Sequence, residues 1–453
     1  MATPEPARKK TPLVGPGYTP VGAADEISDL VLKRPLTWEW LLGAGLAFLL
    51  LGVLAIAVSV LFYRGVGIWG INIPVAWGFA IGNFVWWIGI GHAGTLISAF
   101  LLLMRQKWRT SINRSAEAMT LFAVLCAALF PLLHLGRPWF FYWLIPYPNT
   151  MWLWPQFRSP LVWDFFAVGT YLTVSALFWY VGLLPDLATL RDRAQHPFPR
   201  LAFGVLALGW RGSARHWQRH QTAYLLLAGL ATPLVISVHS IVSLDFTSAI
   251  VPGWHSTIFP PYFVAGAVFS GFAMVLTLLI PLRAAYGLKG LITARHVDLL
   301  AKMMLATGLM VDYSYVMEVF TAWYGGNPYD WSLMVDRMAG AYAPLFWAVM
   351  VCNVAVIQLL WSARVRANPA WLFAIALVAN LGMWMERVMI VITSLHHDFL
   401  PSSWAMYYPT VWDWATLFGT VGLFFFLFFV FIRLLPVISI SEVQKLVIEE
   451  GSR

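Results

Sequence analysis

Hydrophobic residues dominate ten long stretches of this chain, and shorter polar segments separate each stretch from the next. A helix needs roughly 20 mostly apolar residues to cross the hydrocarbon core of a bilayer. The pattern therefore predicts ten membrane-spanning helices, near residues 40–63, 75–104, 115–135, 160–184, 221–245, 258–282, 297–321, 341–362, 370–395 and 411–434. An even number of spans places both ends of the chain on the same side of the membrane.

The composition excludes a soluble domain. Of the 453 residues, 60% are hydrophobic and only 11% are charged, whereas soluble domains average about 25% charged residues. So few charges cannot cover a soluble protein of this size, but lipid needs no charged covering. We therefore predict an all-α integral membrane protein with about ten transmembrane helices.

The net charge of +8 does not indicate a nucleic-acid partner, because the basic residues flank the apolar stretches. Of the 29 Lys and Arg residues, 23 lie on the side of the termini, four lie on the opposite side, and Lys302 and Arg387 lie within spans. The positive-inside rule assigns the basic side to the cytoplasm, so both termini are expected there. Residues 1–38 are expected to form a polar cytoplasmic arm rather than a cleaved signal.

Two short matches indicate an internal repeat. Pro160–Asp164 resembles Pro344–Ala348, and Ser243–Phe246 resembles His396–Phe399. We expect spans two to five and spans six to nine to form two four-helix bundles in parallel orientation, with spans one and ten at the periphery. The expected parts are the arm (1–38), the first span and its loop (39–74), the first bundle (75–257), the second bundle (258–410), and the last span with a cytoplasmic tail (411–453).

Ionisable residues inside a membrane are costly and commonly functional. Four of them in the first bundle are expected to meet near the non-cytoplasmic face: His134, Asp164, His239 and Asp245. Quinol is a planar molecule, and a histidine and a carboxylate at its opposite ends would suit it. Its hydroxyl protons need acceptors as electrons leave. We predict a quinol site there, with His134, Asp164 and Asp245 catalytic and with His239 and Arg137 as further binding residues.

Structural interpretations of these residues stay open. Asp164 can simply cap the fourth span, and Asp245 can lie in interfacial water. His92 can be hydrogen-bonded packing, and the Arg137-Pro138 pair can mark the end of a helix. The glycine-rich stretch from Gly82 to Gly94 indicates close helix packing.

The repeat is chemically asymmetric, because Asp164 corresponds to Ala348 and His134 to Glu318. Two interpretations fit the remaining polar residues inside the spans, a hydrated proton route or mutual neutralisation. The residues assigned to this route are His92, Asp312, Glu318, His396, His397 and Asp398. Glu386 and Arg387 are expected to neutralise each other or a neighbouring residue.

The sequence offers no obvious metal or haem site. Cys126 and Cys352 stand alone in apolar stretches, and the chain has no CxxC pair. A dihaem cytochrome b would need histidine pairs on facing helices at two depths, and the intramembrane histidines give at most one poor pair. A secondary transporter is the alternative class of function, and interrupted helices at the membrane midplane would distinguish it.

The second to fifth spans carry the motifs of a known family. The segments Gly82–Thr95, Pro131–Pro138, Ser159–Asp164 and Ser237–Phe246 resemble the NrfD/PsrC-like membrane subunits, and the resemblance covers residues 35–435. Within that family the chain is most similar to the ActC subunit of bacterial alternative complex III. The sister subunit ActF, thought to lack the quinol site, is the alternative.

This resemblance implies a subunit of a quinol:electron-acceptor oxidoreductase in the bacterial inner membrane. Quinol, with menaquinone the expected quinone, would be oxidised near the periplasmic face at His134, Asp164 and Asp245, which match the family's motifs. Electrons would pass to a periplasmic iron–sulfur subunit and then to a multihaem cytochrome c subunit. A homologous membrane subunit and membrane lipids would be further partners, and proton translocation is a candidate coupled function.

Overall fold

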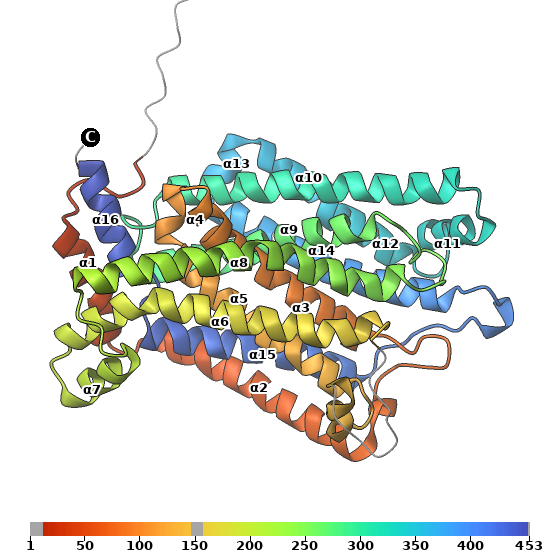
Figure 1. The fold of residues 1–453 in the computed structure, drawn as a ribbon. Coiled ribbons are helices and arrows are strands. Elements are labelled where there is room, and N and C mark those ends of the chain that lie inside the picture. Colours follow the sequence, from red (N-terminus) through yellow and green to blue (C-terminus); the bar gives the residue numbers. More distant parts are fainter. Residues whose placement is uncertain (1–11, 146–156, 452–453) are drawn as a thin grey trace, which may run out of the picture.

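The apolar stretches form long helices, because a helix satisfies its own backbone hydrogen bonds where lipid offers no partner. A computed structural model describes residues 12–145 and 157–451, and every regular element within these ranges is a helix. The helices α1 (Pro20–Leu32) and α16 (Ile440–Gly451) lie together at one end of the bundle (Figure 1). We call this end the terminal end and the opposite end the far end.

Within the described ranges, ten helices form or begin the predicted spans. They are α2 (Trp38–Arg64), α3 (Phe79–Thr95), α5 (Asn113–Leu133), α6 (Pro160–Arg193), α8 (Ala214–Thr247), α9 (Phe259–Ala285), α10 (Ala294–Tyr324), α12 (Ala343–Met350), α14 (Pro369–His396) and α15 (Val411–Leu434). Within the described ranges, nine helical segments are long and apolar enough to cross a membrane. The tenth, α10, has 31 residues and packs beside α9, and it carries Asp312 and Glu318 within its length. The structure thus agrees with about ten spans.

Two spans change their helical geometry partway along. α3 passes through a π-helical turn, η2 (Leu96–Phe100), into the short α4 (Leu101–Leu103). α12 passes through the π-helical η5 (Val351–Ala355) into the 3-10 helix η6 (Val356–Trp361). Both spans stay helical throughout, unlike the unwound helices on which a transporter interpretation depends.

Two sets of four spans share several helix–helix contacts, and the repeat that the sequence suggests stays a prediction. We call α3, α5, α6 and α8 the first set and α9, α10, α12 and α14 the second set. α3 lies against α5 and α8, and α9 lies against α10 and α14; α6 pairs with α8 as α12 pairs with α14. α3 and α9 also pack on each other, and all 17 residues of α3 are buried. α2 and α15 pair with each other beside the two sets.

Small residues allow α3 and α9 to approach closely. A Cβ atom added at Gly271 of α9 would lie 2.5 Å from the Cβ atom of Ala93 and 2.8 Å from the carbonyl oxygen of Ile90 on α3. A Cβ atom added at Gly94 would lie 2.2 Å from the carbonyl oxygen of Ala116 on α5. Close approach through small residues is common between membrane helices, so close packing explains the glycine-rich stretch of the second span.

The terminal end is more structured than the sequence pattern predicts. The expected polar arm contains α1, which packs against α16, and the backbone N–H of Leu13 donates to the Glu450 carboxylate at 3.3 Å. The arginine-rich segment 185–220 is mostly helical, because α6 extends to Arg193 and α7 (Pro197–Leu206) follows. Two further short helices, α11 (Pro328–Ala339) and α13 (Ala363–Ala367), connect spans of the second set. Which side of a membrane each end faces stays a prediction.

Candidate functional site

Two buried carboxyl groups, Asp164 and Asp245, meet near the far end of the first set. Asp164 lies near the start of α6 and Asp245 lies near the end of α8, and these two helices pack against each other. The two side chains are within hydrogen-bonding range of each other. Asp164 is 3% exposed and Asp245 is 8% exposed. Within the described part of the chain, the Oδ1 atom of each has no hydrogen-bond donor.

This geometry excludes two structural interpretations of the acid pair. α6 begins at Pro160 after the N-cap residue Ser159, and Asp164 lies about one turn further along the helix. Asp164 therefore does not cap α6. Asp245 is buried inside the protein, so it does not lie in interfacial water.

Aromatic residues adjoin the acid pair in the sequence. Phe246 follows Asp245, and its ring centroid is 5.0 Å from that of Trp254 and 6.1 Å from that of Trp77. Trp77 in turn stacks on Trp254 at 5.7 Å. On α6, the indole N–H of Trp163 donates to the carbonyl oxygen of Phe157. Flat apolar walls with a few polar groups are typical of sites for planar organic ligands.

A histidine pair lies deeper in the same set. His239 precedes Asp245 by six residues on α8, which corresponds to about 9 Å along the helix axis. Its ring centroid is 4.7 Å from that of His92 on α3, and both side chains are fully buried. His92 Nδ1 lies 2.7 Å from the carbonyl oxygen of Ile88, whereas neither ring nitrogen of His239 has a partner among the described residues. The two rings therefore pack directly against each other.

His134 and Arg137 lie at and beyond the end of α5. His134 is the C-cap residue of α5, and its Nδ1 lies 3.1 Å from the carbonyl oxygen of Phe130. Arg137 is exposed and precedes the short helix η4 (Pro138–Leu144). In the residues that the structure describes, no hydrogen bond or ion pair joins His134 to Asp164. The structure brings Asp164 to Asp245, and the convergence of His134 on the same site stays a prediction.

The second set contains a buried polar network centred on Glu386 of α14. The Glu386 carboxylate accepts hydrogen bonds from the hydroxyl groups of Tyr262 and Tyr315, the latter at 2.8 Å. Arg387 Nη1 lies 3.2 Å from Glu386 Oε1, which confirms the predicted neutralisation of these two residues. The Arg387 guanidinium lies beside Gly266, where an added Cβ atom would be 2.5 Å from Nη2.

The predicted proton-route residues of the second set lie at separate places. Glu318 of α10 accepts a hydrogen bond from Arg337 of α11 at 2.6 Å. Asp312 is half-buried, lies six residues earlier on α10, and accepts from Gln358 at 3.0 Å. The three residues at the end of α14 have other partners: His396 with the carbonyl oxygen of Ala405 at 3.0 Å, His397 with Ser332 at 3.1 Å, and Asp398 with Ser403 at 2.9 Å. These contacts favour local neutralisation and capping over one continuous route through all six.

One buried ion pair at the far end was not predicted. Arg337 is one of the four basic residues that the sequence places in loops on the side opposite the termini. In the structure it is 1% exposed and binds Glu318. Its Nε and Nη2 atoms also donate to Thr393 at 2.7 Å and to Ser394 at 2.9 Å. Pro328 at the first position of α11, after the side-chain N-cap Asn327, is the sequence signal that could have revealed this helix.

The terminal end contains a second buried cluster that the sequence pattern does not predict. Arg114, counted with the loop cations, belongs to α5 and is 1% exposed. Its guanidinium donates to Glu117 at 2.7 Å and to Asp186 of α6 at 3.1 Å. The spacing of three residues between Arg114 and Glu117 is a local signal for a helical pair. Asp186 is distant in the sequence, so no local pattern points to it.

Comparisons with known proteins find similarity over most of the chain. A family model described as "Polysulphide reductase, NrfD" matches residues 69–397, which include the acid pair and the histidine pair. A putative dimethyl sulfoxide reductase membrane subunit of Halobacterium salinarum is 25% identical over 398 residues, which cover 81% of this chain and 80% of that protein. A selenate reductase subunit of Mesobacillus selenatarsenatis is 22% identical over 385 residues, or 80% of this chain and 86% of that one. The Hdr-like menaquinol oxidoreductase integral membrane subunit of Archaeoglobus fulgidus is 20% identical over 433 residues, which cover 89% of this chain and 96% of that protein.

Proposed function

Since this chain belongs to the NrfD family, we propose that it is the quinone-reactive membrane subunit of an oxidoreductase complex and that quinol is oxidised at Asp164 and Asp245. The observation that carries this proposal is the acid pair itself. A structural carboxylate inside a membrane is normally paired with a cation. Within the described residues, no ion pair joins Asp164 or Asp245 to Lys, Arg or His, and an aromatic residue directly follows each of them in the sequence.

The acid pair suits the proton chemistry of quinol oxidation. A quinol that becomes a quinone releases two protons and two electrons. Two carboxylates within hydrogen-bonding range repel each other, so the pair is most stable when it holds one proton. The ionised carboxylate then accepts a proton from a quinol hydroxyl as the electrons leave. The pair passes the two protons, one after the other, to water at the far end.

The two electrons require an acceptor outside this chain. We take the acceptor to be an iron–sulfur subunit bound at the far end, which would be the periplasmic side, with a multihaem cytochrome c subunit beyond it. Together with a homologous membrane subunit, this is the arrangement of alternative complex III. The support is the presence of His134, Asp164 and Asp245 at the motif positions of ActC. Menaquinol is the preferred substrate because the Archaeoglobus fulgidus relative is named a menaquinol oxidoreductase subunit.

Proton translocation through the chain is the second part of this proposal. His239 and His92 of the first set lie beside the α3–α9 interface, and Arg387 and Glu386 lie on its other side. An added Cβ atom at Gly89 would lie 3.5 Å from His239 Cε1, so the imidazole packs at contact distance from α3. Buried polar atoms without protein partners commonly bind water. We expect protons to move along this line rather than through the residues at the end of α14.

The acid pair is tested by Asp164→Asn and Asp245→Asn in the intact complex. Each substitution keeps the size and polarity of the side chain and removes a base. Positioned acid–base groups contribute about 10²–10⁴-fold to rates, so oxidation of a water-soluble menaquinol analogue should fall at least about tenfold while the complex stays assembled. Asp192→Asn removes an exposed carboxylate from the opposite end of α6 and should leave the rate unchanged. Normal turnover in an assembled Asp164→Asn complex contradicts the proposal.

A further inference from the structure

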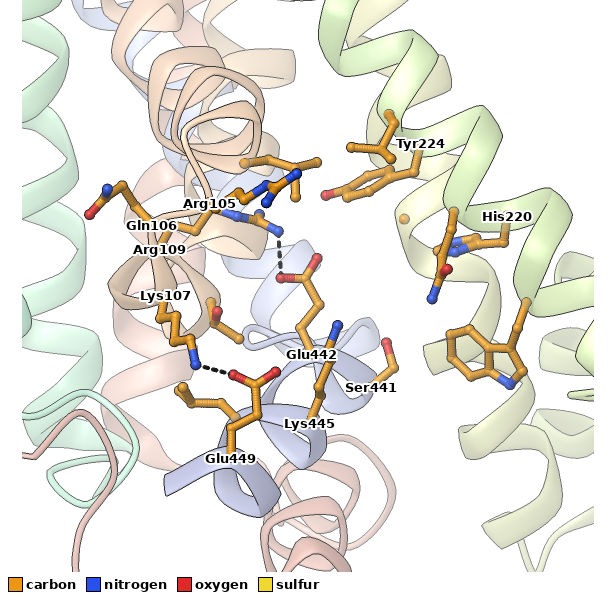
Figure 2. Close-up of a pocket in the computed structure, with 17 residues that line it drawn as sticks. Arg105, Gln106, Lys107, Arg109, His220, Tyr224, Ser441, Glu442, Lys445 and Glu449 are labelled. Atoms are coloured by element: carbon orange, nitrogen blue, oxygen red, sulfur yellow. Dashed lines mark hydrogen bonds and ion pairs between the residues drawn. The ribbon is translucent and has the colours of Figure 1, made fainter. Parts of the chain in front are cut away.

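A cavity of about 520 Å³ opens at the terminal end, away from the acid pair. Its walls come from four parts of the chain: the segment from α4 into η3 (Lys107–Ser111), Gly182 of α6, the first turns of α8, and α16. Figure 2 shows Arg105, Lys107 and Arg109 on one side of the cavity and Tyr224 and His220 on the other. The function proposed above makes no use of this cavity.

The cavity carries an excess of positive charge. Four cationic side chains line it: Arg105, Lys107, Arg109 and Lys445. Lys107 pairs with Glu449, and Arg109 pairs with Glu442 at 2.9 Å. Arg105 and Lys445 have no anionic partner in the part of the chain that the structure describes. Two cations facing one cavity without a counter-ion favour an anionic ligand.

The backbone at Arg105 fixes the position of its side chain. Its φ angle is +54°, in the left-handed region that commonly ends a helix. The N–H of Arg105 donates to the carbonyl oxygen of Leu102 and the N–H of Gln106 donates to that of Leu101, both at 2.9 Å, so this conformation closes the helix that precedes it. The π-helical turn η2 lies just before this position, and such turns are frequent at functional sites.

The remaining lining distinguishes a lipid from a soluble anion. Leu102 and Leu225 line the cavity, and Leu225 is 50% exposed on the surface of a membrane-spanning helix. Trp217 and Tyr224 lie on the same wall, and such amphipathic rings are enriched at membrane–water interfaces. A soluble anion would gain nothing from an apolar wall that continues onto the lipid-facing surface, whereas acyl chains would.

We propose that this cavity binds an anionic phospholipid, with its phosphate facing Arg105 and Lys445 and its acyl chains along Leu102 and Leu225. Basic pockets between membrane helices are known to hold such headgroups. The bound lipid would connect η3, α8 and α16. It would thereby hold the last helix of the chain against the bundle.

The test is lipid binding to the intact complex, measured by native mass spectrometry with added dioleoyl phosphatidylglycerol. Each basic residue near an anionic lipid contributes about 1 kcal/mol, so the double variant Arg105→Gln, Lys445→Gln should bind this lipid about 10- to 30-fold more weakly. The matched control, Arg200→Gln with Lys289→Gln, removes two exposed cations outside the cavity and should bind as the unmodified complex does. Equal weakening in both variants overturns the proposal, because it indicates general surface charge.

Two further binding measurements distinguish an anionic lipid from other ligands. The zwitterionic dioleoyl phosphatidylcholine should bind the unmodified complex weakly and be insensitive to the double variant. Inorganic phosphate at millimolar concentration should not displace the bound lipid, and displacement would identify a soluble-anion site instead. Arg105 and Lys445 are exposed, so the double variant should keep the far-UV circular dichroism and melting behaviour of the unmodified complex in lipid-free detergent. Unchanged lipid binding in that folded variant contradicts the assignment.

Discussion

Replacing Arg337 by methionine is expected to destabilise the far end of the second set. This guanidinium is 1% exposed, and it holds Glu318 of α10 and Thr393 of α14 to α11. Removing one partner of a buried ion pair costs about 3–5 kcal/mol, because the other charge stays buried without compensation. Glu318 borders a cavity of about 480 Å³ through which water can reach it. We therefore expect a loss near the lower limit, about 3 kcal/mol.

The measurement is a double-mutant cycle on the unfolding of the purified chain in mixed micelles, followed by far-UV circular dichroism. Removing both partners with Arg337→Met and Glu318→Leu should recover much of the loss, because no charge then stays buried. The coupling free energy should be at least about 1.5 kcal/mol. Arg364→Met, at an exposed position of α13, is the control and should change stability by less than about 0.5 kcal/mol. A loss for Arg337→Met as small as that of the control would refute the structural reasoning.

Three further predictions concern packing, proton coupling and orientation. Gly271→Val should destabilise the chain by about 1–3 kcal/mol in the same unfolding assay, because its side chain would overlap Ala93, and a neutral result would contradict the close α3–α9 contact. His239→Gln should alter proton release per electron more than the rate of quinol oxidation, because His239 lies on the expected proton line about 9 Å along α8 from Asp245; an equal loss of both would argue against a separate proton role. An impermeant maleimide should label Thr257→Cys in intact spheroplasts and Gln195→Cys only after lysis; the reverse order would overturn the predicted orientation.

The sequence predicts the spans well, because the requirement for about 20 apolar residues is local. It also places Asp164 and Asp245 correctly, since both lie at the same ends of antiparallel neighbours in one set. The depth of each residue follows from counting along its helix. The close α3–α9 contact likewise follows from the glycine-rich stretch of the second span.

The ion pairs could not be predicted in the same way, because they join segments far apart in the sequence. The sequence pattern places Arg337 and Arg114 in loops, since charged residues next to apolar stretches usually lie in water. In the structure each is buried, because a carboxylate from another helix meets it: Glu318 for Arg337 and Asp186 for Arg114. His134 was expected to reach Asp164 because both end their spans on the same side. Depth alone does not specify the direction in which a side chain points, and the structure does not join these two residues.

The central claim is that quinol binds at the acid pair of the first set. The most direct measurement is a density map of the intact complex with a bound, non-oxidisable quinol analogue. The account predicts a planar ring beside Asp164 and Asp245, with one ring hydroxyl within hydrogen-bonding distance of a carboxylate oxygen. A ring bound elsewhere, with the two carboxyl groups in contact only with each other and with water, would contradict it.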